Sequence, residues 1–118
     1  MTTSKRIIHG GLYLADLAPH FSTEPGKVRP VLVLQSNLLN DTGHPSTWVL
    51  PCTTRQVGEN LLRVPLPPGI AGNPQACEVM IDQSCAIDNR RFRRLLGRLS
   101  PKLLREVKDK LRTLASTR

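Results

Sequence analysis

The sequence contains few aromatic residues and no long apolar run. Of its 118 residues, two are Phe, one is Tyr and one is Trp, so a platform of exposed rings for stacking nucleic-acid bases is not expected. No stretch approaches the roughly 18 apolar residues of a transmembrane helix, and the N-terminal MTTSKRII does not read as a signal peptide. The sequence predicts one cytosolic domain over residues 1–118, with a core of Val, Leu and Ile.

Cysteine and histidine are also scarce. Cys52, Cys77 and Cys85 lack metal-ligand spacing, and the three histidines form no paired ligand motif with them. A catalytic thiol needs a base nearby, whereas a free cysteine is more often a small buried hydrophobe. The pattern predicts reduced, partly buried thiols and no metal or cofactor.

The net charge of +8 comes from one end of the chain. Residues 1–87 contain six basic and six acidic residues, whereas residues 88–118 contain eleven basic and three acidic residues. Such a basic segment suits a polyanion, because binding to phosphates releases counterions. The alternative interpretation is a solvated helix face with no partner.

Apolar runs and turn residues predict a small, curled antiparallel sheet or partial barrel with helices attached. Pro51 suggests an edge or a bulge in the third strand, and Ser100 with Pro101 marks the start of a final helix. That helix carries an apolar stripe of Leu103, Leu104, Val107, Leu111 and Leu114. The expected strands are 12–17, 29–35, 47–53, 61–66, 76–83 and 95–99, with a short helix over 89–94 capped by Asp88.

The stretch STEPGKVRPVLVLQSN, residues 22–37, joins a polar loop to the most apolar run in the chain. Four consecutive apolar residues, 31–34, predict a strand that is buried on both faces. Pro30 is tolerated at the first residue of a strand, so Arg29 is expected where a rigid element meets a loop. Taken alone, Arg29 is either a solvated edge residue or a functional group on a rigid support.

The motifs together resemble those of the MazF/PemK-type toxin endoribonucleases, in order from about Gly10 to Leu114. They are GLYLADL (11–17), Glu24 with Gly26, RPVLV (29–33), PCTT (51–54), DQ (82–83), ID (87–88) and GRLS (97–100). The resemblance implies a mainly β fold, an SH3-like small barrel of antiparallel strands with a short helix and a C-terminal helix. It also implies a homodimer that cleaves single-stranded RNA at short sequences without metal and is neutralised by a cognate antitoxin.

Within this resemblance, Arg29 matches the catalytic arginine and Thr53 matches the catalytic threonine. Cleavage would proceed by attack of the ribose 2′-hydroxyl on the adjacent phosphorus, giving a 2′,3′-cyclic phosphate and a 5′-hydroxyl. The phosphorane that forms carries more negative charge than the ground state, so positioned donors stabilise it. A guanidinium and a hydroxyl are such donors.

The general base is not fixed by these motifs. Arginine stays protonated in proteins, so a carboxylate is chemically easier, and the resemblance offers Glu24 and Asp82. Each also has a structural interpretation, since Glu24 could pair with Lys27 and Asp82 could orient Arg29. The full set of predicted supporting or RNA-binding residues is Thr23, Lys27, Thr54, Asp82 and Gln83, and Thr54 replaces Thr53 if the register slips by one.

Some positions depart from the family pattern. Gly11 stands where an acidic residue is usual, Thr23 and Pro25 alter the usual small-Ser-Glu-Gln loop, and Cys85 lies near the position of an arginine that helps to form the RNA groove. His20 is interpreted first as a surface residue and second as a proton shuttle. The loops 36–46 and 66–74 are candidates for base selection.

Two other functions are considered. One is a toxin of the same barrel that binds and poisons DNA gyrase, because a fold does not fix function. The other is a noncatalytic nucleic-acid-binding module that uses only the basic C-terminal segment. Neither requires Arg29 and Thr53 to lie at facing strand ends, so this pair discriminates among the three hypotheses.

Overall fold

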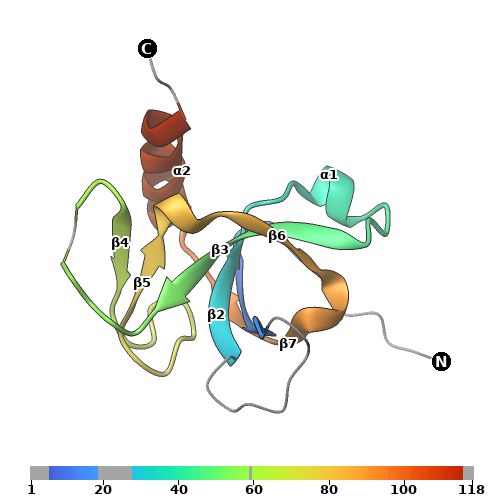
Figure 1. The fold of residues 1–118 in the computed structure, drawn as a ribbon, viewed down its shortest axis with the longest axis horizontal. Helices are drawn as coiled ribbons and strands as arrows, with labels where there is room; N and C mark the ends of the chain where they lie inside the picture. The colour runs from blue at the N-terminus through green and yellow to red at the C-terminus, as the bar shows by residue number, and fades with distance from the viewer. Residues whose placement is uncertain (1–5, 19–27, 59, 116–118) are drawn as a thin grey trace.

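The computed structural model describes residues 6–18, 28–58 and 60–115, and its strands form a curled antiparallel sheet (Figure 1). The strand order is β4-β5-β3-β2-β1-β7, and β6 also pairs with β3. The strands are β1 Gly11–Asp16, β2 Val28–Val33, β3 Ser46–Thr53, β4 Arg63–Leu66, β5 Cys77–Met80, β6 Cys85–Asp88 and β7 Phe92–Arg98. The helical elements are α1 Asn37–Asn40, η1 Ile81–Gln83, η2 Asn89–Arg91 and α2 Pro101–Ala115.

Strand β2 is buried on both faces, as its sequence predicts. Val31, Leu32 and Val33 are fully buried, but alternate side chains enter different cores. Leu32 belongs to the α2-side core, which includes Leu12, Leu50, Val64, Val79 and Val107. Val31 and Val33 belong to the Tyr13 core, which includes Tyr13, Ala15, Val49, Ile87 and Phe92. A strand packed on both faces holds its first residues in a fixed place.

Strand β3 is central rather than at an edge, so of the two alternatives predicted from Pro51, an edge or a bulge, the edge is wrong. Pairing with β2 covers Val49 to Pro51, and pairing with β5 covers Cys52 and Thr53. Pro51 faces Val31 in the last β2–β3 pair, where the partner of β3 changes. A missing N–H is tolerated there because the ladder with β2 ends at that pair.

The final helix confirms its predicted start. Ser100 Oγ accepts a hydrogen bond from the Leu103 N–H at 3.2 Å, and α2 stands beside β4 and β5 in Figure 1. Leu103, Leu104 and Leu111 pack against the α2-side core. Leu114 is 44% exposed, so the apolar stripe ends one turn earlier than predicted. No helix in the described part of the chain is long and apolar enough to cross a membrane.

Several element boundaries differ from the sequence prediction. The expected strand 76–83 ends at Met80 and continues as η1, and β6 was not predicted at all. The helix expected over 89–94 is a single turn, although Asp88 does cap it by accepting the Arg90 N–H at 2.8 Å. Strand β7 therefore begins at Phe92, and its charged residues are tolerated because β7 is an edge strand. The loop 36–46 also contains α1, capped by Ser36.

Candidate active site

Arg29 and Thr53 lie at adjacent ends of neighbouring strands. Arg29 is exposed on β2, and Thr53 is the last residue of β3. The last β2–β3 pair is Val31 with Pro51, so Arg29 and Thr53 each lie two residues beyond that pair, at the same end of the two strands. Because side chains alternate along a strand, both lie on the face that bears Val31, Val33 and Val49. The topology thus places a cation and a hydroxyl at one end of the sheet.

The two strands separate at this end. Pro30 and Pro51 lack backbone N–H groups, and beyond Pro51 strand β3 pairs with β5, Cys52 facing Val79 and Thr53 facing Glu78. The first three residues of β2 pair with β1 but not with β3. Arg29 therefore stands on a strand that is supported from one side and open on the other.

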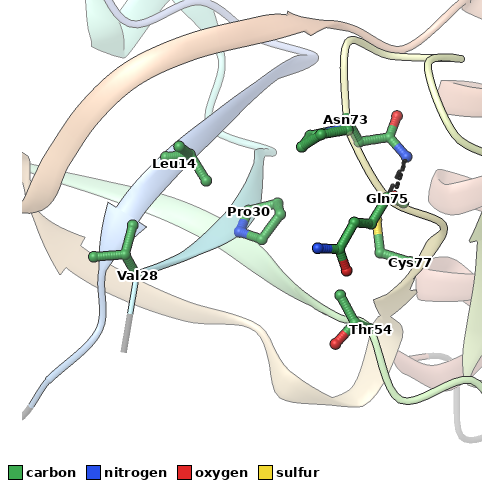
Figure 2. Close-up of a pocket in the computed structure, with 8 residues that line it drawn as sticks. Leu14, Val28, Pro30, Thr54, Asn73, Gln75 and Cys77 are labelled. Carbon is green, nitrogen blue, oxygen red and sulfur yellow. Dashed lines mark hydrogen bonds between the residues drawn. The ribbon is translucent and has the colours of Figure 1, made fainter. Parts of the chain in front are cut away.

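A pocket of about 180 Å³ occupies the space where the strands part. Figure 2 shows Leu14, Val28 and Pro30 on one side of it and Thr54, Gln75 and Cys77 on the other. Asn73 and Pro74 complete the lining. Val28 and Pro30 flank Arg29 in sequence, so the pocket and the Arg29 side chain lie on opposite faces of the same three residues of β2.

The two adjacent threonines have different surroundings. The Thr53 hydroxyl oxygen accepts a hydrogen bond from the Arg55 N–H at 3.1 Å, which still allows the hydroxyl to donate its own proton. Thr54 lies at the bend after β3, is exposed, and lines the pocket instead. The register therefore puts Thr53, and not Thr54, on the same face as Arg29.

A buried carboxylate fixes the segment that follows these threonines. Glu78 is only 1% exposed, and it accepts hydrogen bonds from the Val57 N–H at 3.1 Å and the Gly58 N–H at 2.9 Å. Arg63 completes the cluster with an ion pair at 2.9 Å. Burial alone would raise the pKa of Glu78, but these donors outweigh it and the pKa is lowered. Sequence reasoning missed this residue, although an acid inside the apolar run ACEVMI signals a buried partner.

The loop 67–76, which forms the other wall of the pocket, is also fixed. Asn73 is 1% exposed; its Nδ2 donates to the carbonyls of Leu66, Pro67 and Gln75, and its Oδ1 accepts the Ala71 N–H. A Cβ on Gly72 would lie 2.0 Å from the Leu96 carbonyl oxygen. Only glycine permits this close approach of the loop to β7.

Asp82 and Gln83 lie on η1 and are exposed. After Glu78, which faces Thr53, the chain continues along β5 and η1 towards the middle of β3, and η1 packs against α2. No hydrogen bond or ion pair joins Asp82 to Arg29 among the described residues. The structure thus places Thr53 and Thr54 at one end of β3, Arg29 at the neighbouring end of β2, and Asp82 and Gln83 on η1. Thr23, Glu24 and Lys27, together with His20, lie outside the described residues, so their roles stay predictions.

Several of the C-terminal arginines have structural partners. Arg93 pairs with Asp16 at 3.0 Å, and Arg91 donates to the carbonyls of Asp16 and Ala18. Hydrogen bonds from Arg90 hold the pKa of Asp88 at about 2. Part of the basic excess thus fixes the end of β1. The exposed cations that form no ion pair with another described residue include Arg94, Arg98, Lys102, Arg105 and Lys108.

The three cysteines differ in their exposure to solvent. Cys52 and Cys77 are buried, and Cys85 is exposed on β6. Within the part of the chain that the structure describes, no group of three or more His, Cys, Asp or Glu residues is placed to hold a metal ion.

Comparison with known proteins finds chains of similar sequence and fold. The curated Endoribonuclease MazF of Staphylococcus saprophyticus is 29% identical over 106 residues, which cover 85% of this chain and 83% of that protein. The solved MazF from Deinococcus radiodurans is 26% identical with a TM-score of 0.77, covering 95% of this chain and 98% of that chain. The Mycobacterium tuberculosis toxin MazF-mt6 has the same fold, with a TM-score of 0.70 at 21% identity over 87% of this chain and 93% of that chain.

These similarities confirm the mainly β fold with its C-terminal helix, and they agree with the predicted endoribonuclease class of enzyme. The model of one family, described as PemK-like, MazF-like toxin of type II toxin-antitoxin system, matches residues 9–115. The resemblance recognised in the sequence is thereby confirmed. This chain belongs to the family of PemK-like, MazF-like toxins of type II toxin-antitoxin systems.

Proposed function

We propose that this chain is a metal-independent endoribonuclease that cleaves single-stranded RNA by 2′-hydroxyl attack. The products are a 2′,3′-cyclic phosphate and a 5′-hydroxyl. The observation that supports this proposal is that Arg29 and Thr53 each lie two residues beyond the last β2–β3 pair, where the two neighbouring strands diverge. The relative from Staphylococcus saprophyticus, an endoribonuclease, supports the same reaction class.

Arg29 and Thr53 supply the electrostatic part of the reaction. The guanidinium presents a planar fork of N–H donors to two phosphate oxygens, and Thr53 retains its O–H to donate to a third oxygen or to the same one. The backbone of both groups is paired before substrate binds, Arg29 with β1 and Thr53 with β5. Preorganised donors of this kind stabilise the charge that develops on the phosphorane.

Proton transfer from the 2′-hydroxyl is assigned to Glu24 rather than Asp82. Arginine is a poor base because it stays protonated, and η1 carries Asp82 away from the end of β3 where Thr53 lies. Glu24 precedes Arg29 by five residues in the sequence, and a carboxylate can act as a general base. A matched pair of variants, Glu24→Gln and Asp82→Asn, separates the two assignments: only the first is expected to flatten the acidic limb of the pH–rate profile.

The cellular setting follows from the family. A type II toxin is paired with a protein antitoxin, so a cognate antitoxin is proposed to neutralise this chain, which acts on cytoplasmic RNA as a homodimer. Solved relatives include the MazE-MazF complex of Deinococcus radiodurans, 25% identical with a TM-score of 0.74. The single toxin domain is proposed to span residues 1–118.

The decisive experiment incubates the purified protein with a long RNA in EDTA and maps the new 5′ ends. Cleavage at a short recurring sequence, with 5′-hydroxyl ends, is the expected result. A single 2′-deoxy substitution at the scissile nucleotide should abolish cutting at that site. Cutting that persists on the 2′-deoxy substrate would exclude this mechanism, and dependence on an added metal would exclude the metal-independent chemistry.

A further inference from the structure

The pocket beside Arg29 has the composition of a ligand site. It is open to solvent at Val28, whose side chain is 44% exposed although it is apolar. The apolar wall consists of Leu14, Val28 and Pro30, and the opposite wall carries the polar groups of Thr54 and Gln75. An apolar wall facing a few fixed polar groups is the usual composition of a ligand site.

Gln75 is the polar group best placed to contact a ligand. Its carboxamide lies between Pro30 and Thr54 in Figure 2, and it is exposed without a side-chain hydrogen bond to any other described residue. The backbone that carries it is held by the Asn73 hydrogen bond to the Gln75 carbonyl at 2.8 Å and by the contact of Gly72 with β7. A free carboxamide on a fixed loop can recognise a partner without first losing loop entropy.

The position of the pocket indicates which ligand it takes. Arg29 lies on one face of residues 28–30 and the pocket on the other. A base next to a phosphate bound by Arg29 would reach the pocket by crossing the edge of β2 that is unpaired with β3. Unstacked bases of single-stranded RNA are recognised by apolar contact with their faces and by hydrogen bonds to their edges.

We propose that this pocket binds one nucleobase adjacent to the scissile phosphate and that Gln75 selects adenine there. A carboxamide offers one donor and one acceptor side by side, and its regular pairing is with the N6 amino group and a ring nitrogen of adenine. Leu14, Val28 and Pro30 contact the face of the base in place of an aromatic ring. This inference rests on the proposed RNA-cleaving function, which it extends to sequence choice.

The test compares the cleavage profiles of wild type, Gln75→Ala and Gln75→Glu on a library of RNA oligonucleotides. Wild type is expected to prefer adenine at one position beside the cut by about 10-fold to 100-fold, the discrimination of one good bidentate pair. Gln75→Ala should lose that preference alone, and Gln75→Glu should shift it towards cytosine, whose amino group pairs with a carboxylate. Gln56→Ala is the matched control, because Gln56 is exposed and lines no part of the pocket.

The outcomes separate this inference from the proposed function. Wild type that cleaves RNA, with a Gln75→Ala profile unchanged at every position, overturns the subsite and leaves the nuclease intact. A uniform loss of rate in Gln75→Ala, equal for all bases, also overturns it, since it would show a structural role. Wild type that cleaves no RNA under any condition overturns both proposals. The same preference measured as affinity for uncleavable 2′-deoxy oligonucleotides, lost in Gln75→Ala, supports the subsite independently of rate.

Discussion

The polar side chains at the two ends of β3 differ in their hydrogen bonding. At the end near α1, polar groups bind one another: Thr47 donates to Asn89 at 2.6 Å, and Asn89 donates to the His44 carbonyl at 2.7 Å. At the other end, Arg29, Thr54 and Gln75 make no side-chain hydrogen bond to any described residue. The first end, the closed end, is completed by the chain itself. The second, the open end, presents polar groups on rigid supports, which is the arrangement that a substrate requires.

The largest expected effect comes from removing the carboxylate that supports the open end. Glu78→Ala leaves Arg63 without its ion pair and the Val57 and Gly58 N–H groups without an acceptor. Breaking a buried pair from one side costs about 3–5 kcal/mol of unfolding free energy, measurable by urea unfolding at neutral pH. A loss of unfolding free energy below about 1 kcal/mol would be that of a weak surface ion pair. It would show that Glu78 does not stabilise the open end.

The same residue predicts a pH dependence with a definite sign. The folded-state pKa of Glu78 is below its ordinary value of 4.5, so its stabilising contribution is present above that value and is lost as the pH falls through the folded pKa. Wild type should therefore lose unfolding free energy as the pH falls below 4.5, by more than Glu78→Gln does. Equal losses in both proteins would assign the acid sensitivity to other carboxylates.

The next effect acts on rate rather than on stability. Arg29→Ala and Thr53→Val should each reduce cleavage by about 10²–10³, the usual result of removing one preorganised donor. Because Arg29 is exposed, its replacement should leave the urea midpoint unchanged. Arg94→Ala is the matched control, an exposed arginine on β7 without an ion-pair partner among the described residues. An equal loss in Arg94→Ala would indicate general phosphate attraction instead of catalysis.

Sequence patterns predict the supports of this site better than the site itself. The run VLVL predicts β2 because a strand packed on both faces must be continuously apolar, and Ser100-Pro101 predicts α2 because capping is local. By contrast, Glu78 and Arg63 are fifteen residues apart, and only the register of β4 with β5 brings them together. Residues 85 and 86 of β6 are exposed, so the strand lacks a clear apolar period and is specified by pairing with β3.

The pocket could not be predicted from the sequence, because its shape also depends on contacts between residues that are distant in the sequence. The proline- and glycine-rich segment predicts only an irregular loop. Its actual shape depends on the close contact of Gly72 with Leu96 of β7 and on the Asn73 hydrogen bonds. The position of Gln75 is thus set by residues distant in the sequence, whereas Arg29 is positioned by its own strand and was predicted.

A smaller effect should follow from a change at the closed end. Thr47 is a buried residue, only 1% exposed. Asn89→Ala leaves its hydroxyl without the side-chain oxygen that accepts its hydrogen bond. An unsatisfied buried polar group costs about 1–3 kcal/mol, so the urea midpoint should fall. Cleavage per folded molecule should match wild type at a temperature where both are folded. A rate loss beyond the unfolded fraction would mean that the closed end also takes part in the reaction.

The smallest expected effect separates the two threonines at the open end. Thr54→Val keeps the branched shape and removes the hydroxyl of a residue that lines the pocket, so cleavage should fall by less than about tenfold, the value of one ordinary hydrogen bond. Thr53→Val should lose far more, because the β2–β3 register places Thr53 on the face of Arg29. The reverse order would assign catalysis to Thr54 and would mean that the phosphate lies on the pocket side of β2. Measuring both single variants and the double variant on one substrate decides between these assignments, since two groups that bind the same phosphate are not additive.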